Sequence, residues 1–302
     1  MEMNGVGHLT VDNSMVRSSI WVAFIATLFL FGSCSKKIET AEETGNSKFL
    51  GFVGADSLSK PFEFNEGNPI EISLDPAKID SKVKLSDLMI DYRLVSLKNW
   101  EGGVVGSVDK ILFTDSLVFV LDQYTYNSLQ VFDLFTGDQV GLFYPSGEGP
   151  GEMKNIAEFD LDEPNRRILI YDNSLAKMLY FTFEGQFLFE KRLPIRGHSF
   201  KIFPDNQLLF SSIGDANDHL GKTGESDLFL LDSNYIIQNT YKYPKIDQKL
   251  SQYIPRDVIR ENGGSVTYFP RFSNELLQLE WETKTLKPLI QVDLGSIGLS
   301  DE

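Results

Sequence analysis

The feature that most constrains the fold is a unit of four short strand-like segments that returns about every fifty residues. Apolar, β-branched and aromatic runs make up the segments, and Gly, Asn, Asp and Pro separate them. In the first two units, the turn glycines Gly137 and Gly185 stand 48 positions apart. The strands expected in these two units lie at residues 108–113, 117–122, 129–133, 139–144, 157–162, 167–172, 178–183 and 186–191.

Two further units follow at nearly the same spacing. Their expected strands lie at residues 199–203, 207–211, 227–232, 235–238, 265–269, 275–281 and 286–294. A regular four-strand unit is typical of a β-propeller blade, whereas a β-sandwich of unrelated strands is the alternative that also produces short strands. We therefore expect an all-β protein, a β-propeller with four-stranded antiparallel blades over residues 107–302. Residues 248–259 are the one helical candidate.

The N-terminal residues are typical of a secretory signal peptide. Residues 20–31 form an uncharged apolar run, and Arg17 supplies a positive charge just before it. The acidic stretch before Met15 has no part in such a signal, so Met15 is the expected start and residues 1–33 the expected signal peptide.

The residues after the apolar run, Phe31-Gly32-Ser33-Cys34, resemble a bacterial lipobox, although Phe31 stands where leucine is usual. The resemblance implies that the Cys34 thiol carries a diacylglyceryl group and that the signal is cut before Cys34. The alternative is an ordinary signal that is cut after Ser33. A lipidated Cys34 would anchor the chain to a membrane, with polar residues 34–48 as a flexible tether. We expect the outer membrane of a bacterial envelope, and the sequence leaves open the periplasmic and the outer surface.

A resemblance to a known family rests on four segments: 108–144, the linker Gly147-Glu148-Gly149-Pro150-Gly151-Glu152, 159–162 and 170–173. Together they resemble the six-bladed β-propeller lipoproteins of Bacteroidetes. Residues 92–97 resemble the lead-in strand of that family, so residues 49–106 are expected to hold lead-in strands.

The resemblance covers roughly residues 70–295, and it implies a β-propeller fold and a location in the bacterial cell envelope. The family ring has six blades, and this chain holds about four. An incomplete ring, which fits a truncated reading frame, is expected; an open arc and a four-bladed ring are the alternatives.

Composition excludes several classes of function. The chain has 43 acidic and 28 basic residues and a net charge of −15, which argues against a nucleic-acid partner. The single cysteine excludes a disulfide framework and a thiolate-rich metal site, and three scattered histidines leave little material for a metal cluster. No nucleophile elbow and no zinc-protease motif is present. Asp122 and Asp172 end the second strand of their units and are expected to bind backbone groups of turns.

The expected ligand site lies on the face where the linkers between blades and the loops between second and third strands emerge. Aromatic rings there would stack on a sugar, while Asn and carboxylate groups would bind its hydroxyls. The segment 215–219 also offers oxygen ligands at alternate positions, which makes calcium the one cofactor to consider. It lacks the glycine and the closing glutamate of a calcium loop. The candidate ligand-binding residues are Tyr124, Tyr126, Glu148, Glu152, Asn173, Asp215, Asn217 and Asp218.

Two classes of function fit these observations. The first is an anchored binding or scaffold module for a glycan, a peptide or an envelope protein, with no catalytic residues. The alternative is a propeller hydrolase, lactonase or lyase that uses carboxylates and a divalent cation. The scarcity of histidine favours the binding module. The sequence leaves the ligand and the oligomeric state open.

The lipid anchor gives the first testable prediction. The variant Cys34→Ala lacks the thiol that would be acylated, so the protein should move from the membrane fraction to the soluble fraction. Metabolic labelling with a fatty acid and fractionation of cells measure both effects. Equal membrane retention of the variant and the wild type would place the anchor elsewhere.

Overall fold

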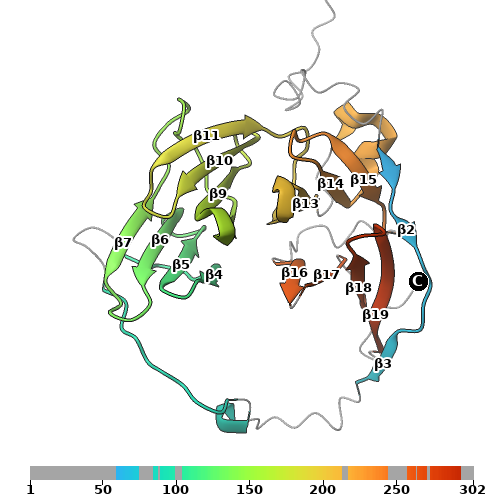
Figure 1. Cartoon of the computed structure of the whole chain (residues 1–302), viewed down its shortest axis with the longest axis horizontal. Helices are drawn as coiled ribbons and strands as arrows, with labels where there is room; N and C mark the ends of the chain where they lie inside the picture. The colour runs from blue at the N-terminus through green and yellow to red at the C-terminus, as the bar shows by residue number, and fades with distance from the viewer. Residues whose placement is uncertain are drawn as a thin grey trace, which may run out of the picture. The chain divides into compact units, whose positions relative to one another are not determined.

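The computed structural model of the chain describes residues 59–74, 84–87, 89–98, 104–212, 217–243, 257–262, 264–270 and 273–293. Four sheets are arranged as a four-bladed β-propeller (Figure 1). In each blade four consecutive strands pair in antiparallel order, from the inner strand at the axis to the outer strand at the rim.

The strands of blades 1 and 2 follow the expected segments closely. Blade 1 contains β4 (Lys110–Phe113), β5 (Leu117–Asp122), β6 (Ser128–Asp133) and β7 (Gln139–Phe143). Blade 2 contains β8 (Glu158–Asp162), β9 (Arg167–Asp172), β10 (Lys177–Thr182) and β11 (Phe187–Arg192).

Blades 3 and 4 complete the propeller. Blade 3 contains β12 (Ser199–Ile202), β13 (Leu208–Ser211), β14 (Leu228–Leu231) and β15 (Ile237–Tyr241). Blade 4 contains β16 (Ile259–Asn262), β17 (Ser265–Tyr268), β18 (Glu275–Glu280) and β19 (Thr285–Asp293). Short 3-10 turns η4 (Glu163–Asn165) and η5 (Pro204–Asn206) join the first two strands of blades 2 and 3, and η6 (Asp218–Glu225) lies between β13 and β14.

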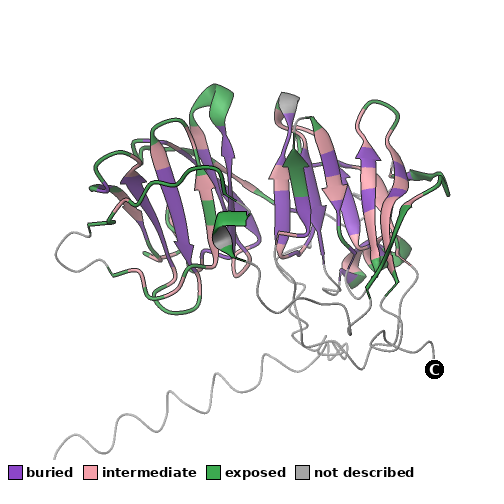
Figure 2. Ribbon diagram, turned by 90° about the horizontal axis from the view of Figure 1, so that it is seen from below, coloured by how far each residue is buried: buried purple, intermediate pink, exposed green. Residues whose placement is uncertain are grey.

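The core consists of layers between neighbouring blades. Phe119, Leu129 and Phe159 belong to the layer between blades 1 and 2, and Leu209 and Leu277 belong to the layer between blades 3 and 4. In blades 1 to 3 the second and third strands are buried on both faces, which explains nearly continuous apolar runs such as Leu117–Leu121. Buried residues accordingly fill the interior strands, and exposed residues lie at the hairpins (Figure 2).

A segment before blade 1, which we call the N-terminal belt (the described residues of 59–98), covers the outer strands of three blades. Within it, β1 (Lys60–Pro61) pairs in parallel with β15. The strands β2 (Glu63–Phe64) and β3 (Ile70–Ser73) pair in parallel with β19. After the 3-10 turn η3 (Leu85–Asp87), Lys98 forms a parallel bridge with Asp138, beside β7.

The structure confirms the all-β propeller and corrects two local predictions. Residues 248–256 of the helical candidate lie outside the described residues, and Ile259 begins the inner strand β16, which the sequence analysis missed. Arg260, Glu261 and Asn262 of β16 are exposed, so the strand lacks the apolar alternation of its neighbours. Residues 92–97 form no strand. Tyr92, Leu94 and Leu97 remain exposed, and among the described residues no strand pairs with this segment before the bridge at Lys98.

Among the described residues, no helix has the length and the apolar character that crossing a membrane requires.

Phe62 gives the prediction that tests the belt. Its side chain is 5 % exposed and packs with residues of blades 3 and 4, whereas Phe64 is 46 % exposed. We expect Phe62→Ala to lower the free energy of unfolding by about 3–5 kcal/mol, the usual cost of truncating a buried Phe. The matched variant Phe64→Ala should cost much less, and urea unfolding curves measure both. Equal effects of the two substitutions would show that Phe62 is not packed between the blades in solution.

Candidate functional site

Tyr124 and Tyr126 of the expected ligand face lie in the loop between β5 and β6, with exposed fractions of 73 % and 56 %. The next residue, Asn127, ties this loop to its neighbours: its Nδ2 donates to Asn155 Oδ1 (2.8 Å), and Asn155 Nδ2 donates to Asn173 Oδ1 (2.6 Å). The structure therefore groups Asn173 with the loop that carries the two tyrosines. The Oδ1 of Asn173 already accepts a hydrogen bond in this chain of contacts.

Glu148 and Glu152 lie in the linker between blades 1 and 2. Glu152 Oε2 accepts a hydrogen bond from the Gly149 N–H (2.8 Å), and Glu148 forms an ion pair with Lys154. Gly151 has φ +77°, a left-handed conformation that favours glycine. The two carboxylates thus have partners within their own linker, and both side chains remain exposed.

The candidates near residue 217 lie in blade 3, between β13 and β14. Asp215 lies outside the described residues. Asn217 is fully buried: its Oδ1 accepts from the Arg196 N–H (2.7 Å), and its Nδ2 donates to the Arg196 carbonyl (3.2 Å). These bonds fix η6 to the linker between blades 2 and 3. Asp218 is exposed at the start of η6.

The two strand-terminal aspartates bind turn backbone, as the sequence predicted. Asp122 accepts from the N–H groups of Gly106 (2.7 Å) and Thr125 (3.0 Å). Asp172 accepts from those of Lys154 (2.6 Å) and Leu175 (2.9 Å). Each carboxylate therefore joins the linker that enters its blade to the loop between its second and third strands.

The pKa of Asp122 reflects these contacts. Burial by itself raises the pKa of this carboxyl group, but the hydrogen bonds from Tyr126, Gly106 and Ser107 favour the charged form and lower the pKa below its ordinary 3.8.

A cluster of charges that the sequence analysis missed lies at the axis, where the inner strands converge. The Lys110 ammonium on β4 lies 2.9 Å from Glu158 Oε1 on β8 and 3.5 Å from Asp257 Oδ1, just before β16. On β12, Lys201 lies 3.1 Å from Asp160 Oδ1. We call these five residues the axial cluster. It joins all four blades.

Within the axial cluster, burial and the neighbouring charges shift the pKa values in opposite directions. Burial would lower the pKa of Lys110, but the nearby carboxylates of Glu158, Asp160 and Asp257 outweigh it and raise the pKa, so Lys110 is positively charged. Burial raises the pKa of Glu158, and the ion pair with Lys110 offsets part of this shift. Among the described residues, no group of three or more His, Cys, Asp or Glu is arranged to hold a metal ion.

Two cavities adjoin the axial cluster. One of about 250 Å³ lies among the inner strands and is lined by Lys110, Asp160 and residues of β12 and β16. The other, of about 420 Å³, which we call the hairpin cavity, opens beside η4 and η5. Lys201 and Glu261 line both. The hairpin cavity lies on the face opposite to the expected ligand face, and its polar lining consists of Asp162, Glu163, Asn165, Lys201, Asp205, Asn206 and Glu261.

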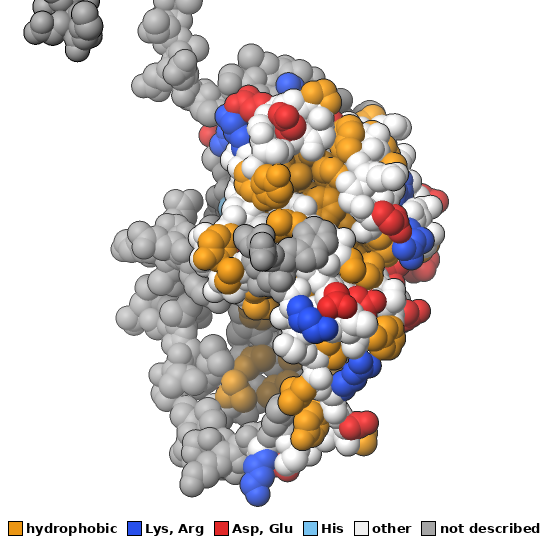
Figure 3. All heavy atoms as spheres, turned by 90° about the vertical axis from the view of Figure 1, so that its left-hand side faces the viewer, with side chains coloured by type: hydrophobic (Ala, Val, Ile, Leu, Met, Phe, Trp, Pro, Cys, Tyr) orange, Lys and Arg blue, Asp and Glu red, His pale blue; other side chains and the backbone are white. Residues whose placement is uncertain are grey.

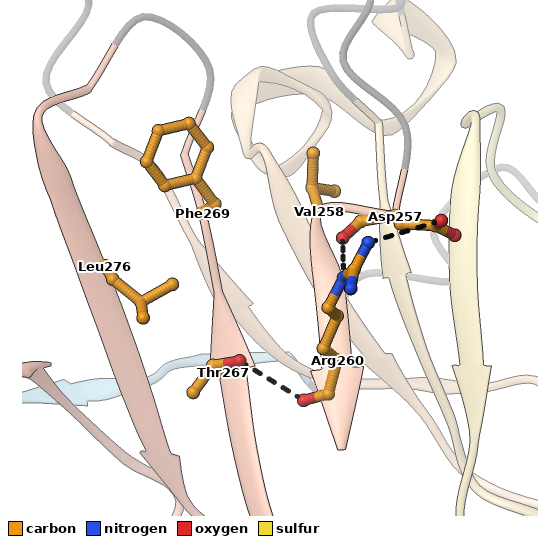
Figure 4. Close-up of a pocket in the computed structure, with 6 residues that line it drawn as sticks. All are labelled: Asp257, Val258, Arg260, Thr267, Phe269 and Leu276. Atoms are coloured by element: carbon orange, nitrogen blue, oxygen red, sulfur yellow. Dashed lines mark hydrogen bonds and ion pairs between the residues drawn. The ribbon is translucent and has the colours of Figure 1, made fainter. Parts of the chain in front are cut away.

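A third cavity of about 230 Å³ lies on blade 4 (Figure 4). Val258, Phe269 and Leu276 form an apolar wall, and the exposed Arg260 guanidinium points toward Asp257, with 3.6 Å between Nη2 and Oδ2.

One signal in the sequence marks the axial cluster. First strands of the units carry charged residues at positions where buried strands usually carry apolar ones: Lys110, Glu158, Asp160 and Lys201. Lys110 and Glu158 stand 48 positions apart, which is the spacing of the repeat. The partner Asp257 has no such signal, because β16 itself was not recognised.

A family model described as a domain of unknown function, DUF4934, matches residues 69–302. No curated protein matches the chain. Among solved structures, the chain is similar to a Bacteroides fragilis protein provisionally named as an exported protein, with a TM-score of 0.61 and 20 % identity. The match covers 75 % of this chain and 60 % of that one, so this chain spans less than two thirds of its relative.

Two other solved structures show weaker similarity. A protein of unknown function from Bacteroides caccae has a TM-score of 0.37 and 14 % identity, and the match covers 60 % of this chain and 59 % of that one. Virginiamycin B lyase from Staphylococcus aureus has a TM-score of 0.39 and 13 % identity, with 62 % and 55 % covered. TM-scores this low support no inference about function.

The lowered pKa of Asp122 gives a pH-dependent prediction. The charged carboxylate stabilises the fold above the ordinary pKa of 3.8, and this contribution disappears as the pH falls through the lower native pKa. At pH 7, Asp122→Asn should lower the free energy of unfolding by about 1.5–3 kcal/mol, the range for hydrogen bonds to charged groups. The difference from wild type should shrink below pH 4.

The matched control is Asp115→Asn, at an exposed position of the hairpin between β4 and β5. It should change stability little at any pH. A difference between Asp122→Asn and wild type that stays constant from pH 7 to pH 3 would contradict the role assigned to this carboxylate.

Proposed function

The chain belongs to the DUF4934 family of domains of unknown function, and on this premise we propose that it is a lipid-anchored β-propeller of the bacterial cell envelope that binds a glycan, peptide or protein partner. The signal-like residues 20–31 and the lipobox at Cys34 support the location, as does the provisional name of the Bacteroides fragilis relative.

The observation that carries the proposal is the acidic hairpin cavity. Among the described residues, Glu163, Asp205 and Glu261 line it without forming an ion pair. The two nearby bases are already engaged: Arg167 pairs with Asp162, and Lys201 pairs with Asp160. The cavity therefore presents uncompensated negative charge.

These properties favour a ligand that carries ammonium or guanidinium groups. A volume of about 420 Å³ falls in the usual range of small-ligand sites and accommodates one or two side chains of a peptide. Carboxylates hydrogen-bond strongly to such cations, since charge-assisted bonds are about twice as strong as neutral ones. A basic segment of a peptide or protein partner is thus the ligand that the hairpin cavity supports best.

A glycan is the second candidate, and the exposed pair Tyr124 and Tyr126 favours it. Their rings offer faces on which a sugar ring stacks. In this proposal the loops on that face bind the sugar, and the exposed carboxylates of Glu148 and Glu152 accept hydrogen bonds from its hydroxyl groups.

The alternative of a hydrolase, lactonase or lyase would place a divalent cation among carboxylates of several blades. Glu158, Asp160 and Asp257 all lie close to the Lys110 ammonium at the axis, but among the described residues they are not arranged to hold a metal ion. A divalent cation would have to displace this ammonium. The buried ion pairs therefore support a binding module over a metal-dependent enzyme.

Titration with pentalysine tests the acidic cavity. We expect the double variant Glu163→Gln/Asp205→Asn to bind pentalysine at least tenfold more weakly than wild type at low salt. The control Asp115→Asn/Glu71→Gln removes the same charge from two exposed positions elsewhere and should bind as wild type does. Equal weakening by both variants would show that net charge alone attracts the peptide, and this outcome would contradict a site in the cavity.

Titration with neutral oligosaccharides tests the glycan candidate. The double variant Tyr124→Ala/Tyr126→Ala should lose binding of any oligosaccharide that wild type binds, while pentalysine binding and stability stay unchanged. Normal sugar binding by this variant would show that the tyrosine face is not the site.

A further inference from the structure

The third cavity, which we call the blade-4 cavity, lies on one face of the sheet of blade 4. Arg260 on β16 pairs with Thr267 on β17, and the Phe269 N–H donates to the Val258 carbonyl (2.8 Å), so the pairing continues past the ends of both strands. Because side chains alternate between the faces of a strand, Val258 and Phe269 lie on the same face as Arg260 and Thr267. Leu276 of β18 completes the apolar wall (Figure 4).

The opposite face of this sheet packs against blade 3. Ile259, Tyr268 and Leu277 alternate with the residues of the cavity and belong to the buried layer between blades 3 and 4. Phe269 lies outside that layer and is 41 % exposed. The apolar wall of the blade-4 cavity is therefore partly open to solvent.

The Arg260 guanidinium beside this wall has hydrogen-bond donors to spare. Its side chain is 72 % exposed, its Nε donates to the Asp257 carbonyl (3.4 Å), and its Nη2 lies 3.6 Å from Asp257 Oδ2. Among the described residues, no other group accepts a hydrogen bond from it, although a guanidinium carries several N–H donors in one plane. Asp257 thus orients the guanidinium and leaves donors for a ligand.

The charges around Arg260 favour a singly charged anion. Asp257 offsets part of the positive charge of Arg260, but the same carboxylate also lies 3.5 Å from the Lys110 ammonium. One carboxylate therefore faces two cations, and a ligand with one negative charge restores the balance. A planar carboxylate is the best match, because it accepts two parallel hydrogen bonds from a guanidinium.

Exposed apolar side chains elsewhere do not adjoin a base with spare donors in the same way. Figure 3 shows the side of the molecule that carries β7 and β11, where hydrophobic side chains lie between charged ones. Phe189 of β11 is 36 % exposed there, but both nearby lysines are engaged. Lys177 pairs with Glu190 (2.9 Å), and Lys191 Nζ donates to the Ser233 carbonyl (2.7 Å).

We propose that the blade-4 cavity binds a small carboxylate ligand with an apolar body. The carboxylate accepts hydrogen bonds from Arg260, and the body packs against Val258, Phe269 and Leu276. A volume of about 230 Å³ lies below the usual range for drug-sized ligands, so the body has about the size of one apolar side chain. This chemistry occurs in a free organic acid and in the C-terminal residue of a peptide.

The site is separate from the acidic hairpin cavity. The described residues that line the two cavities do not overlap, and the ligands have opposite charge. The two proposals can therefore fail independently, and unchanged pentalysine binding by a variant of Arg260 would show that the hairpin cavity is intact.

Titration of the full chain in a nonionic detergent with phenylacetate tests the proposal. The methyl NMR signals of Val258 and Leu276 report directly on occupancy of the cavity. We expect a saturable shift of these signals with phenylacetate and at least tenfold weaker binding of phenylacetamide, which has the same shape without the charge. Acetate, which lacks the apolar body, should also bind at least tenfold more weakly.

The variant Arg260→Gln should weaken phenylacetate binding at least tenfold. The matched control Arg166→Gln changes another exposed arginine that forms an ion pair, with Glu184, and should bind as wild type does. Phe269→Ala should also weaken binding, because it removes part of the apolar wall. Urea unfolding of each variant shows whether the fold is retained.

A second arm of the titration distinguishes the two sources of the carboxylate. If the natural ligand is a peptide C-terminus, the peptide Gly-Gly-Gly-Phe should bind more tightly than phenylacetate, and its C-terminal amide should not bind. If it is a free acid, phenylacetate should bind and the peptide should not. Equal binding of phenylacetate and phenylacetamide would overturn the proposal. Equal weakening by Arg260→Gln and Arg166→Gln, or no saturable shift with any of these probes, would also overturn it.

Discussion

The Lys110 ammonium joins three of the four blades at the axis. It belongs to blade 1, donates to Glu158 Oε1 and to the Phe159 carbonyl of blade 2, and lies 3.5 Å from Asp257 of blade 4. Its side chain is only 9 % exposed, so leaving it unpaired would be costly. Blade 3 is connected to these residues by Lys201, which binds Asp160 of blade 2. The meeting of the inner strands, and with it the two cavities beside the axial cluster, depends on these ion pairs.

Apolar layers and aspartate contacts extend this arrangement outward. Between blades, layers such as that of Phe119, Leu129 and Phe159 supply most of the burial. At one end of the blades, Asp122 and Asp172 hold linkers against loops, which leaves Tyr124 and Tyr126 on a fixed but exposed loop. At the other end, the hairpins that contain η4 and η5 contribute Glu163 and Asp205 to the lining of the hairpin cavity. The two faces therefore differ in chemistry: one carries exposed tyrosines beside the partnered carboxylates Glu148 and Glu152, and the other carries the carboxylates of the hairpin cavity.

Much of this fold could be predicted from the sequence, because a blade is a local unit whose turns and apolar runs repeat. Strands such as Leu117–Asp122 and Arg167–Asp172 have the predicted bounds. The inner strand β16 was missed because Arg260, Glu261 and Asn262 are exposed and carry no apolar signal. The belt strands β1 to β3 are equally hard to predict, because each is only two to four residues long and exists by pairing with a distant blade.

The site was harder to predict than the fold. Strand order predicts that the loops of Tyr124, Tyr126 and Asn173 emerge on one face, and hydrogen bonds through Asn127 and Asn155 connect these loops. The hairpin cavity was missed because a ligand site was expected only on the face of the linkers, whereas the hairpins of blades 2 and 3 carry Glu163 and Asp205 on the opposite face. The contact of Lys110 with Asp257 joins residues 147 positions apart and depends on how the four blades close around the axis.

That contact provides the most direct test of the account. A double-mutant cycle with Lys110→Met and Asp257→Asn, followed by urea unfolding, measures the coupling between blades 1 and 4. Residues in contact usually show interaction energies of about 0.5–3 kcal/mol, and we predict a coupling in this range, with the pair stabilising the fold. Additive effects, with a coupling below about 0.3 kcal/mol, would contradict this account of the fold, because blade 4 would then not lie beside blade 1 at the axis.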